Sequence, residues 1–92
     1  MSFYLKDPRS RVDYTIDWSS GLDGRTIAAS LWSVTPDEED GIAAGETGFA
    51  PTWTVVRLSG GLTGHAYTVS NQVTFSDGTI DLRSITLRAE AR

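Results

Sequence analysis

The sequence predicts an all-β protein built as an antiparallel β-sandwich of about six to seven strands. Three observations lead to this fold class. Apolar and polar side chains alternate through several segments, as expected of strands with one buried face. Gly-containing turns separate these segments at a spacing of roughly ten residues. No segment has the periodicity of a helix longer than a turn or two. Together these features favour a sandwich over a mixed α and β fold.

The length and composition indicate one domain with a packed core. The chain has 92 residues, of which 39% are hydrophobic, including three Trp, three Tyr and three Phe. This length is close to that of a single immunoglobulin-like unit, about 100 residues. The absence of Cys excludes a disulfide and a Cys-based zinc site, so packing must stabilise the domain. We expect no metal ion and no cofactor.

The charge and the apolar runs exclude two classes of partner. The net charge is −4, which disfavours nucleic-acid binding because phosphate backbones are also negative. The longest apolar run is far shorter than the roughly 20 residues that a membrane span needs. The first eight residues contain charges and a Pro, unlike a signal peptide. We therefore expect a protein that binds neither nucleic acid nor membrane.

The chain begins with a predicted N-terminal arm, residues 1–9, ahead of an immunoglobulin-like domain over residues 10–92. Phe3, Tyr4 and Leu5 are apolar, and the next proline ends any regular element. Two interpretations stay open. The arm is either a first edge strand folded onto the domain or a segment that docks on a neighbouring subunit. On the second interpretation, removing the arm spares folding and weakens assembly.

Two strands follow the arm. Residues 10–18 alternate cleanly, which predicts a half-buried strand. Residues 26–34 carry apolar groups on both faces, so this strand is either central in a sheet or contains a bulge. Trp18 and Trp32 each close or fill a strand, and we expect them to lie in the core.

The middle of the chain has the weakest pattern. The acidic run Asp37–Asp40 is followed by three Gly and few large side chains, which predicts a mobile loop with room for one short edge strand. We interpret the acidic run as solvated; the alternatives are loose Ca²⁺ binding or a basic partner. Strand pattern resumes over residues 52–58. Trp53 is either a core residue or an exposed aromatic anchor for a partner.

The C-terminal third predicts a hairpin and a tyrosine corner. Residues 64–75 alternate, a turn follows at Ser76-Asp77-Gly78, and the last strand runs from Thr79 to about Ala89. Leu62, Gly64 and Tyr67 form a Leu-x-Gly-x-x-Tyr pattern, in which the Tyr hydroxyl bonds back to the chain as it enters a sandwich strand. The apolar phase of the last strand changes midway, which predicts a bulge near residues 83–84.

The sequence does not predict an enzyme. His65 is the one His, so a Ser-His-Asp triad would have to use it, and we interpret it as an ordinary turn residue. No carboxylate pair lies in an obviously buried setting. Arg83 and Arg88, with Arg57, form either a basic stripe for an acidic partner or ion pairs within the sheets, with Asp13, Asp17 or Asp81. We favour the ion pairs.

Several short pieces of the sequence, in this order and spacing, are similar to a known family: Lys6-Asp7-Pro8, Asp13 to Trp18, Thr26-Ile27, Trp32 to Val34, Leu58 to Gly61, Gly64 with Tyr67 to Asn71, Arg83-Ser84, and Leu87-Arg88. The chain resembles immunoglobulin-like structural proteins of tailed phages and prophages, of the fibre–tail adaptor type. The resemblance implies a non-enzymatic virion protein, made in the bacterial host cytoplasm and present in multiple copies. Its implied partners are tail, connector or fibre subunits.

Combining the residues with this resemblance gives a set of candidate sites. The candidate partner-binding residues are Phe3, Tyr4, Leu5, Trp53, Arg83 and Arg88. The structural residues are Trp18, Trp32 and Tyr67. Two alternatives stay open: a capsid decoration protein, and a carbohydrate- or host-surface-binding module that uses Trp53 and the acidic loop.

Overall fold

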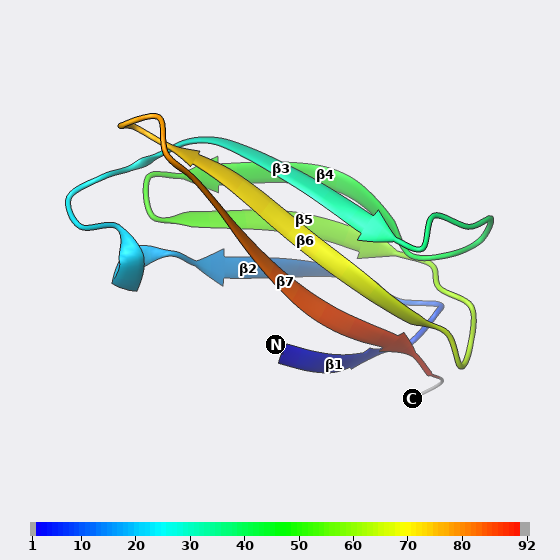
Figure 1. The fold of residues 1–92 in the computed structure, drawn as a ribbon. Coiled ribbons are helices and arrows are strands. Elements are labelled where there is room, and N and C mark those ends of the chain that lie inside the picture. Colours follow the sequence, from blue (N-terminus) through cyan, green and yellow to red (C-terminus); the bar gives the residue numbers. More distant parts are fainter. Residues whose placement is uncertain (1, 91–92) are drawn as a thin grey trace.

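A computed structural model describes residues 2–90 of the protein, with side chains from residue 4 onward. The predicted all-β sandwich is confirmed, with seven strands in two sheets (Figure 1). The strands are β1 (Ser2–Lys6), β2 (Arg11–Asp17), β3 (Ile27–Thr35), β4 (Ala43–Ala50), β5 (Trp53–Ser59), β6 (Ala66–Phe75) and β7 (Ile80–Ala89). Within this part of the chain the helical element is a single 3₁₀ turn, Ser19–Gly21, and no helix is long and apolar enough to cross a membrane.

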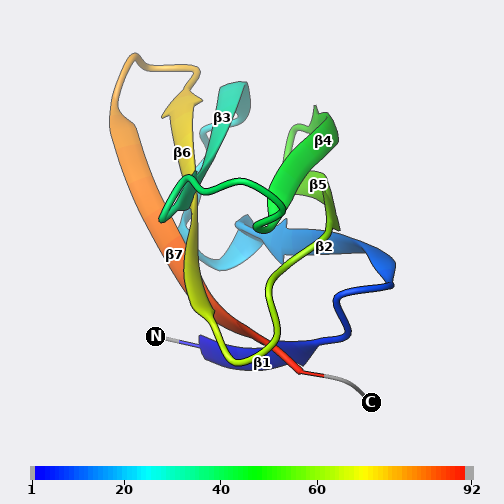
Figure 2. The ribbon, with the colours of Figure 1, turned by 90° about the vertical axis from the view of Figure 1, so that its right-hand side faces the viewer.

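The two sheets lie face to face as separate layers (Figure 2). One sheet has four strands in the order β1-β7-β6-β3, and the other has three in the order β2-β5-β4. All neighbouring strands are antiparallel except β1 and β7, which run parallel. The predicted antiparallel sandwich therefore carries one parallel pairing, at its N-terminal strand.

β1 is a strand of the domain's own sheet. It pairs with β7 from Ser2 opposite Ile85 to Lys6 opposite Ala89. The Lys6 side chain is 2% exposed. Its ammonium donates to the carbonyl oxygens of Asp7 (3.0 Å), Ser10 (2.8 Å) and Gly60 (2.7 Å). Burial lowers the pKa of Lys6, and the nearby Asp7 opposes this. These contacts match the edge-strand interpretation of the N-terminal residues.

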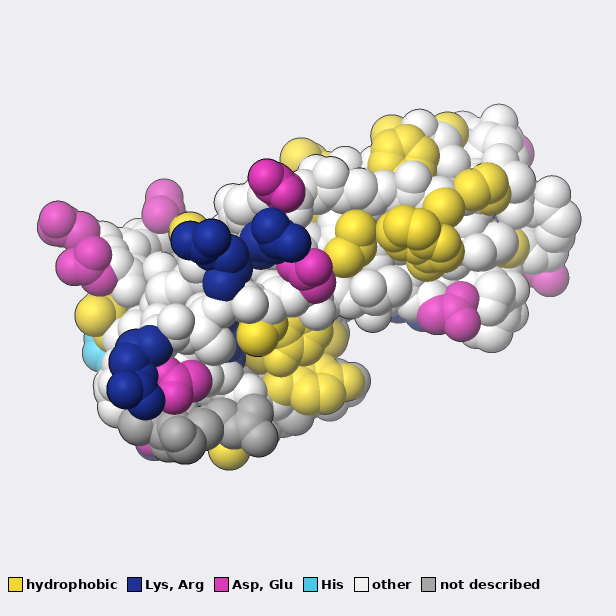
Figure 3. All heavy atoms as spheres, turned by 180° about the vertical axis from the view of Figure 1, so that it is seen from behind, with side chains coloured by type: hydrophobic (Ala, Val, Ile, Leu, Met, Phe, Trp, Pro, Cys, Tyr) yellow, Lys and Arg dark blue, Asp and Glu magenta, His cyan; other side chains and the backbone are white. Residues whose placement is uncertain are grey.

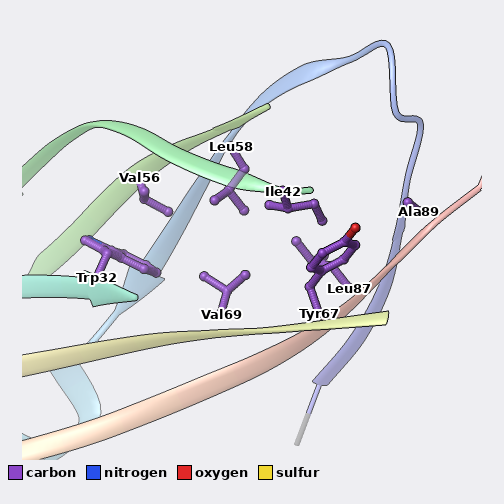
Figure 4. Close-up of a cluster of buried hydrophobic side chains, with 8 residues drawn as sticks. All are labelled: Trp32, Ile42, Val56, Leu58, Tyr67, Val69, Leu87 and Ala89. Carbon is purple, nitrogen blue, oxygen red and sulfur yellow. The ribbon is translucent and has the colours of Figure 1, made fainter. Parts of the chain in front are cut away.

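The core consists of two apolar clusters between the sheets. The larger cluster, shown in Figure 4, contains Trp32, Ile42, Val56, Leu58, Tyr67, Val69, Leu87 and Ala89. The smaller contains Trp18, Leu22, Ile27, Val73 and Phe75. Both structural Trp residues are buried, Trp18 at 1% and Trp32 at 9% exposure. These two indole rings therefore remove a large apolar surface from water.

A buried polar network connects the two sheets. The Thr54 hydroxyl donates to the Asn71 Oδ1 at 2.7 Å, and both side chains are fully buried. The indole Nε1 of Trp18 donates to the same two groups at 3.2 Å. The Asn71 amide donates in turn to the Ser30 hydroxyl at 2.9 Å. Because each buried polar group has a partner, the network costs little desolvation and fixes how the sheets face each other.

In β3 and β7 the sequence left open which apolar residues share one face of the strand, and the structure decides both cases. In β3 the pairing with β6 shifts between Ile27 and Ala29, which confirms a bulge, and β3 is an edge strand. In β7 the pairing with β6 is continuous, so the bulge predicted near residues 83–84 is wrong. The apolar side chains change from one face of β7 to the other because Ile80 and Leu82 lie on the outer face of the sheet, where they are 63% and 56% exposed.

β4 replaces most of the predicted mobile loop. It is eight residues long and pairs antiparallel with β5, with a register shift between Ala44 and Thr47. Six of its eight residues are Ala, Gly or Thr and most of the strand is exposed, so it leaves no alternating hydrophobic pattern in the sequence. The loop that remains between β3 and β4 carries the acidic run.

Candidate partner-binding surfaces

The first candidate surface surrounds Trp53 on the outer face of the three-stranded sheet. It is a hollow of about 530 Å³ lined by Thr15, Asp17, Ser19, Thr52, Trp53 and Val55. Cross-strand pairing builds it, because Thr15 lies opposite Val55 and Asp17 lies opposite Trp53. We call these six residues the Trp53 surface. Figure 3 shows this side of the molecule, where apolar side chains gather toward one end and charged ones lie near the middle and at the opposite end.

Trp53 is an exposed aromatic residue, with 41% of its surface accessible. Trp53 is therefore not a core residue, and its side chain is accessible to a partner. At the rim, Asp17 accepts a hydrogen bond from the Ser19 backbone N–H at 2.9 Å. The side chain of Ser19, followed by this backbone bond, lowers the pKa of Asp17, so the rim carries a negative charge at neutral pH.

The second candidate surface is a groove along the open side of the sandwich, between β2 and the β1–β7 pair. Its volume is about 400 Å³, and its lining residues are Tyr4, Tyr14, Thr15, Ile16, Asp17, Arg83, Ser84 and Ile85. The rings of Tyr4 and Tyr14 meet edge to face with centroids 5.6 Å apart. We call this the tyrosine groove. Thr15 and Asp17 line both hollows, so the Trp53 surface and the tyrosine groove are neighbours across β2.

The three predicted arm residues belong to β1 and do not share one face. Tyr4 pairs with Leu87 and Leu5 pairs with Arg88, so successive side chains point to opposite faces of the sheet. Tyr4 is 45% exposed beside the tyrosine groove, and Leu5 is 46% exposed. The backbone of Phe3 pairs with Thr86, while its side chain lies outside the described part of the structure. The side chains of the candidate residues Tyr4 and Leu5 therefore lie on two different faces of the sheet.

The arginines form separate contacts in two different sheets. Arg83 lies on β7 with its guanidinium 4.2 Å from the centre of the Trp18 ring, and it donates to the Asp17 carbonyl at 3.0 Å. Arg88 pairs with Glu90 at 2.6 Å. Arg57, on β5, pairs with Asp13 at 2.9 Å, as the ion-pair interpretation predicted. The alternative of one basic stripe made by all three residues is wrong, because Arg57 lies in the other sheet.

The tyrosine corner is present and continues into the acidic loop. The Leu62 backbone N–H donates to the Tyr67 hydroxyl oxygen at 3.0 Å, as the Leu-x-Gly-x-x-Tyr pattern predicts. The Tyr67 hydroxyl donates to Glu38 Oε1 at 2.6 Å. His65 Nδ1 lies 2.9 Å from the same carboxylate oxygen. The interpretation of the whole acidic run as solvated is therefore wrong for Glu38.

These contacts change how readily Glu38 and Tyr67 ionise. The hydrogen bond from Tyr67, followed by that from His65, lowers the pKa of Glu38. Burial, together with the Glu38 carboxylate, raises the pKa of Tyr67. Both shifts keep Glu38 charged and Tyr67 neutral at neutral pH, which preserves the bond between them. Across residues 2–90 no three His, Asp or Glu side chains are grouped to hold a metal ion.

Sequence reasoning missed the role of Glu38 and the outer-face leucines. Glu38 is 29 residues from Tyr67, and no local pattern links positions so far apart. Leu31 and Leu82 are 64% and 56% exposed, although their strand pattern suggested buried positions. Because much of any protein surface is apolar, strand alternation alone does not show which apolar residues are exposed.

Comparisons with known proteins give a family and a fold. The family model described as podophage GP4 fiber-tail adaptor protein gp77 matches residues 6–88. Among solved structures, the solution structure of the PKD domain from KIAA 1837 protein is similar with a TM-score of 0.55 and 19% sequence identity. That similarity covers 99% of this chain and 82% of the PKD-domain chain, and it supports the immunoglobulin-like fold. No curated protein sequence matches the chain.

Proposed function

The chain belongs to the family of the podophage GP4 fiber-tail adaptor protein gp77, and from this premise we propose that it is a non-enzymatic virion protein that joins the tail or connector to fibres. The family match carries the proposal. It covers residues 6–88, which include all of β2 to β6 and nearly all of β7. The same adaptor role follows from the resemblance seen in the sequence.

A rigid sandwich with two neighbouring hollows suits a joining role. The Trp53 surface offers an exposed indole beside Val55, and aromatic side chains of this kind often dominate protein–protein affinity. The tyrosine groove offers a second docking place on the other side of β2. We expect each contact to be modest and its repetition on a symmetric particle to multiply the affinity.

The N-terminal residues contribute to this role as part of a fixed surface. β1 is held in the sheet by its pairing with β7 and by the buried Lys6 ammonium. Leu5 therefore presents its exposed side chain from a defined position on the outer face, next to Arg88. A neighbouring subunit that docks there meets an ordered strand and loses less conformational entropy than on a mobile arm.

Quantitative mass spectrometry of purified phage particles tests the proposal directly. A small copy number that matches the symmetry of the tail or connector supports an adaptor. Hundreds of copies per particle would contradict it and identify a capsid decoration protein. Absence from the particle would remove the virion role altogether.

One observation favours a second candidate function, a carbohydrate- or host-surface-binding module. The exposed ring of Trp53 lies in a hollow with the Asp17 carboxylate and the hydroxyls of Thr15, Ser19 and Thr52. An aromatic face beside polar groups also suits a sugar ring. Titration with host-surface polysaccharide, followed by Trp fluorescence, separates the two functions. A sugar-dependent change that disappears in Trp53→Ala supports the module, whereas no change in the wild type removes it.

A further inference from the structure

β3 is an edge strand without the charged side chains that usually prevent edge-to-edge pairing. In the described part of the chain, β6 is its one neighbour in the sheet. Its nine residues contain no charged side chain and no Pro. The bulge between Ile27 and Ala29 affects its first residues and leaves a regular stretch up to Thr35. Exposed edges of this kind are templates for another strand.

The other three edge strands in the described structure are protected. β1 is five residues long, and Pro8 follows shortly after it. β2 presents Asp13 and Asp17 among its exposed residues. β4 carries Glu46 and a register shift beside it. Charges and bulges are the usual means of blocking unwanted pairing. Among the described edge strands, β3 differs from the others in having no charged residue within the strand.

We propose that two copies of this chain pair through β3, antiparallel and about a two-fold axis, so that their four-stranded sheets form one continuous sheet. A two-fold interface brings the same strand from both copies together, so the strand must be complementary to itself. An uncharged strand meets that condition because no like charges face each other across the ladder.

The charges flanking β3 select the antiparallel arrangement. The acidic run Asp37–Asp40 follows the C-terminal end of β3, while Asp23 and Arg25, whose charges cancel, precede the N-terminal end. Antiparallel pairing sets the acidic flank of each copy beside the neutral flank of the other. Parallel pairing would set the two acidic flanks side by side, where their like charges repel.

The outer face of β3 supplies an apolar contact at the centre of this pairing. Leu31 is 64% exposed on that face. If the two-fold axis passes beside Leu31, the two Leu31 side chains become cross-strand neighbours and Ala29 lies opposite Ser33. Within each copy Leu31 pairs with Gln72, which pairs with Leu82. The contact therefore extends an existing uncharged row across both copies.

Two measurements on the full chain test the pairing. Light scattering coupled to size exclusion should give twice the mass of the chain at high micromolar concentration and a falling mass on dilution. Amide hydrogen exchange should show protection of residues 29–35 that increases with concentration. A monomeric mass throughout, with exchange independent of concentration, would overturn the pairing. It would leave the adaptor role intact, since that depends on copy number in the particle.

A matched pair of variants locates the interface at the strand edge. Leu31→Lys places two ammonium groups beside the two-fold axis and should give a monomer whose melting temperature equals that of the diluted, monomeric wild type. Leu82→Lys makes the same change on the same face, two strands away on β7, and should leave the dimer intact. Equal loss of dimer in both variants would overturn edge pairing, because it would show that the sheet face is the contact.

A charge pair completes the test. Leu31→Lys and Leu31→Glu should each be monomeric, and mixing them should restore the dimer as a mixed species, because the two side chains then meet as opposite charges. Native mass spectrometry distinguishes this species by its mass. Failure of the mixture to associate, when the wild type does, would overturn the placement of the axis beside Leu31.

Discussion

Tyr67 and Glu38 are joined by a 2.6 Å hydrogen bond that ties the acidic loop to the start of β6. The Tyr67 hydroxyl oxygen also accepts the Leu62 backbone N–H, so one buried phenol connects three segments of the chain. Its ring lies in the larger apolar cluster. Tyr67 thus combines core packing with positioning of the loop between β3 and β4.

Replacing Tyr67 by Phe should destabilise the domain. The ring stays in the core, while the Leu62 N–H loses its acceptor and Glu38 loses its donor. We expect a loss of about 1–2 kcal/mol in the free energy of unfolding, measured by urea denaturation. The control is Tyr4→Phe, since Tyr4 is 45% exposed. Equal stability of Tyr67→Phe and the wild type would contradict a stabilising tyrosine corner.

Acid should weaken the domain partly through Glu38. Tyr67 and His65 lower the pKa of Glu38 below its ordinary value of 4.5 in the folded state. The unfolded state therefore takes up a proton first as the pH falls. The stabilisation is present above the ordinary pKa and is lost as the pH falls through the lowered value. Melting temperatures measured from neutral to acidic pH should decline less steeply in Glu38→Gln than in the wild type; parallel profiles would contradict this.

Replacing Lys6 by Met should also destabilise the domain. The Met chain fills similar space, but the carbonyl groups of Asp7, Ser10 and Gly60 lose their donor. We expect a loss of at least about 1–3 kcal/mol, the usual cost of leaving a buried polar group without its partner. Thermal or urea unfolding measures the loss. Arg9→Met, at a side chain that is 82% exposed, provides a control that should change little.

Deleting residues 1–9 should lower the melting temperature, contrary to the expectation from the docking-arm interpretation. The deletion removes the β1 ladder along β7 and the Lys6 contacts together. It also exposes the edge of β7. A truncated chain with the melting temperature of the wild type would show that β1 adds nothing to folding. Circular dichroism is sufficient for this comparison.

Trp53 and Trp18 should differ sharply when each is replaced by Ala. Trp53 is 41% exposed, so its loss should change stability by less than about 1 kcal/mol and should reduce incorporation into particles. Trp18 is 1% exposed and bonds to Thr54 and Asn71, so its loss should cost about 3–5 kcal/mol. Unfolding curves and particle composition separate the two effects. Normal incorporation of Trp53→Ala would remove Trp53 from the partner surface.

The sequence predicts the elements that depend on patterns among neighbouring residues. Alternating side chains give β2, β5 and β6, and the Leu-x-Gly-x-x-Tyr spacing gives the bond between Leu62 and Tyr67. For β4 the sequence indicates only room for a short edge strand within a loop, because a strand of mostly small, exposed residues at a sheet edge has no buried face to impose a pattern. The error in β7 arises from assuming that Ile80 and Leu82 are buried, whereas much of any protein surface is apolar.

The candidate site depends on contacts between distant positions, and there the sequence is less informative. Trp53 could be named as a possible anchor, but its exposure follows from the pairing of β5 with β2 and β4. Arg83 could be named as a charged residue, but its place over Trp18 follows from how the two sheets cross. Such relationships depend on tertiary geometry, which no local spacing encodes.

The parallel pairing of β1 with β7 has a mechanical consequence. The chain enters at the Ser2 end of β1 and leaves at the Ala89 end of β7, and these lie at opposite ends of the paired strands (Figure 1). Tension applied through the two termini therefore pulls the strands past each other lengthwise. The hydrogen bonds of the ladder then share the load and must break together, whereas pulling from one end would peel them apart singly. A pulling experiment through the termini should accordingly meet a high rupture force at this pair of strands.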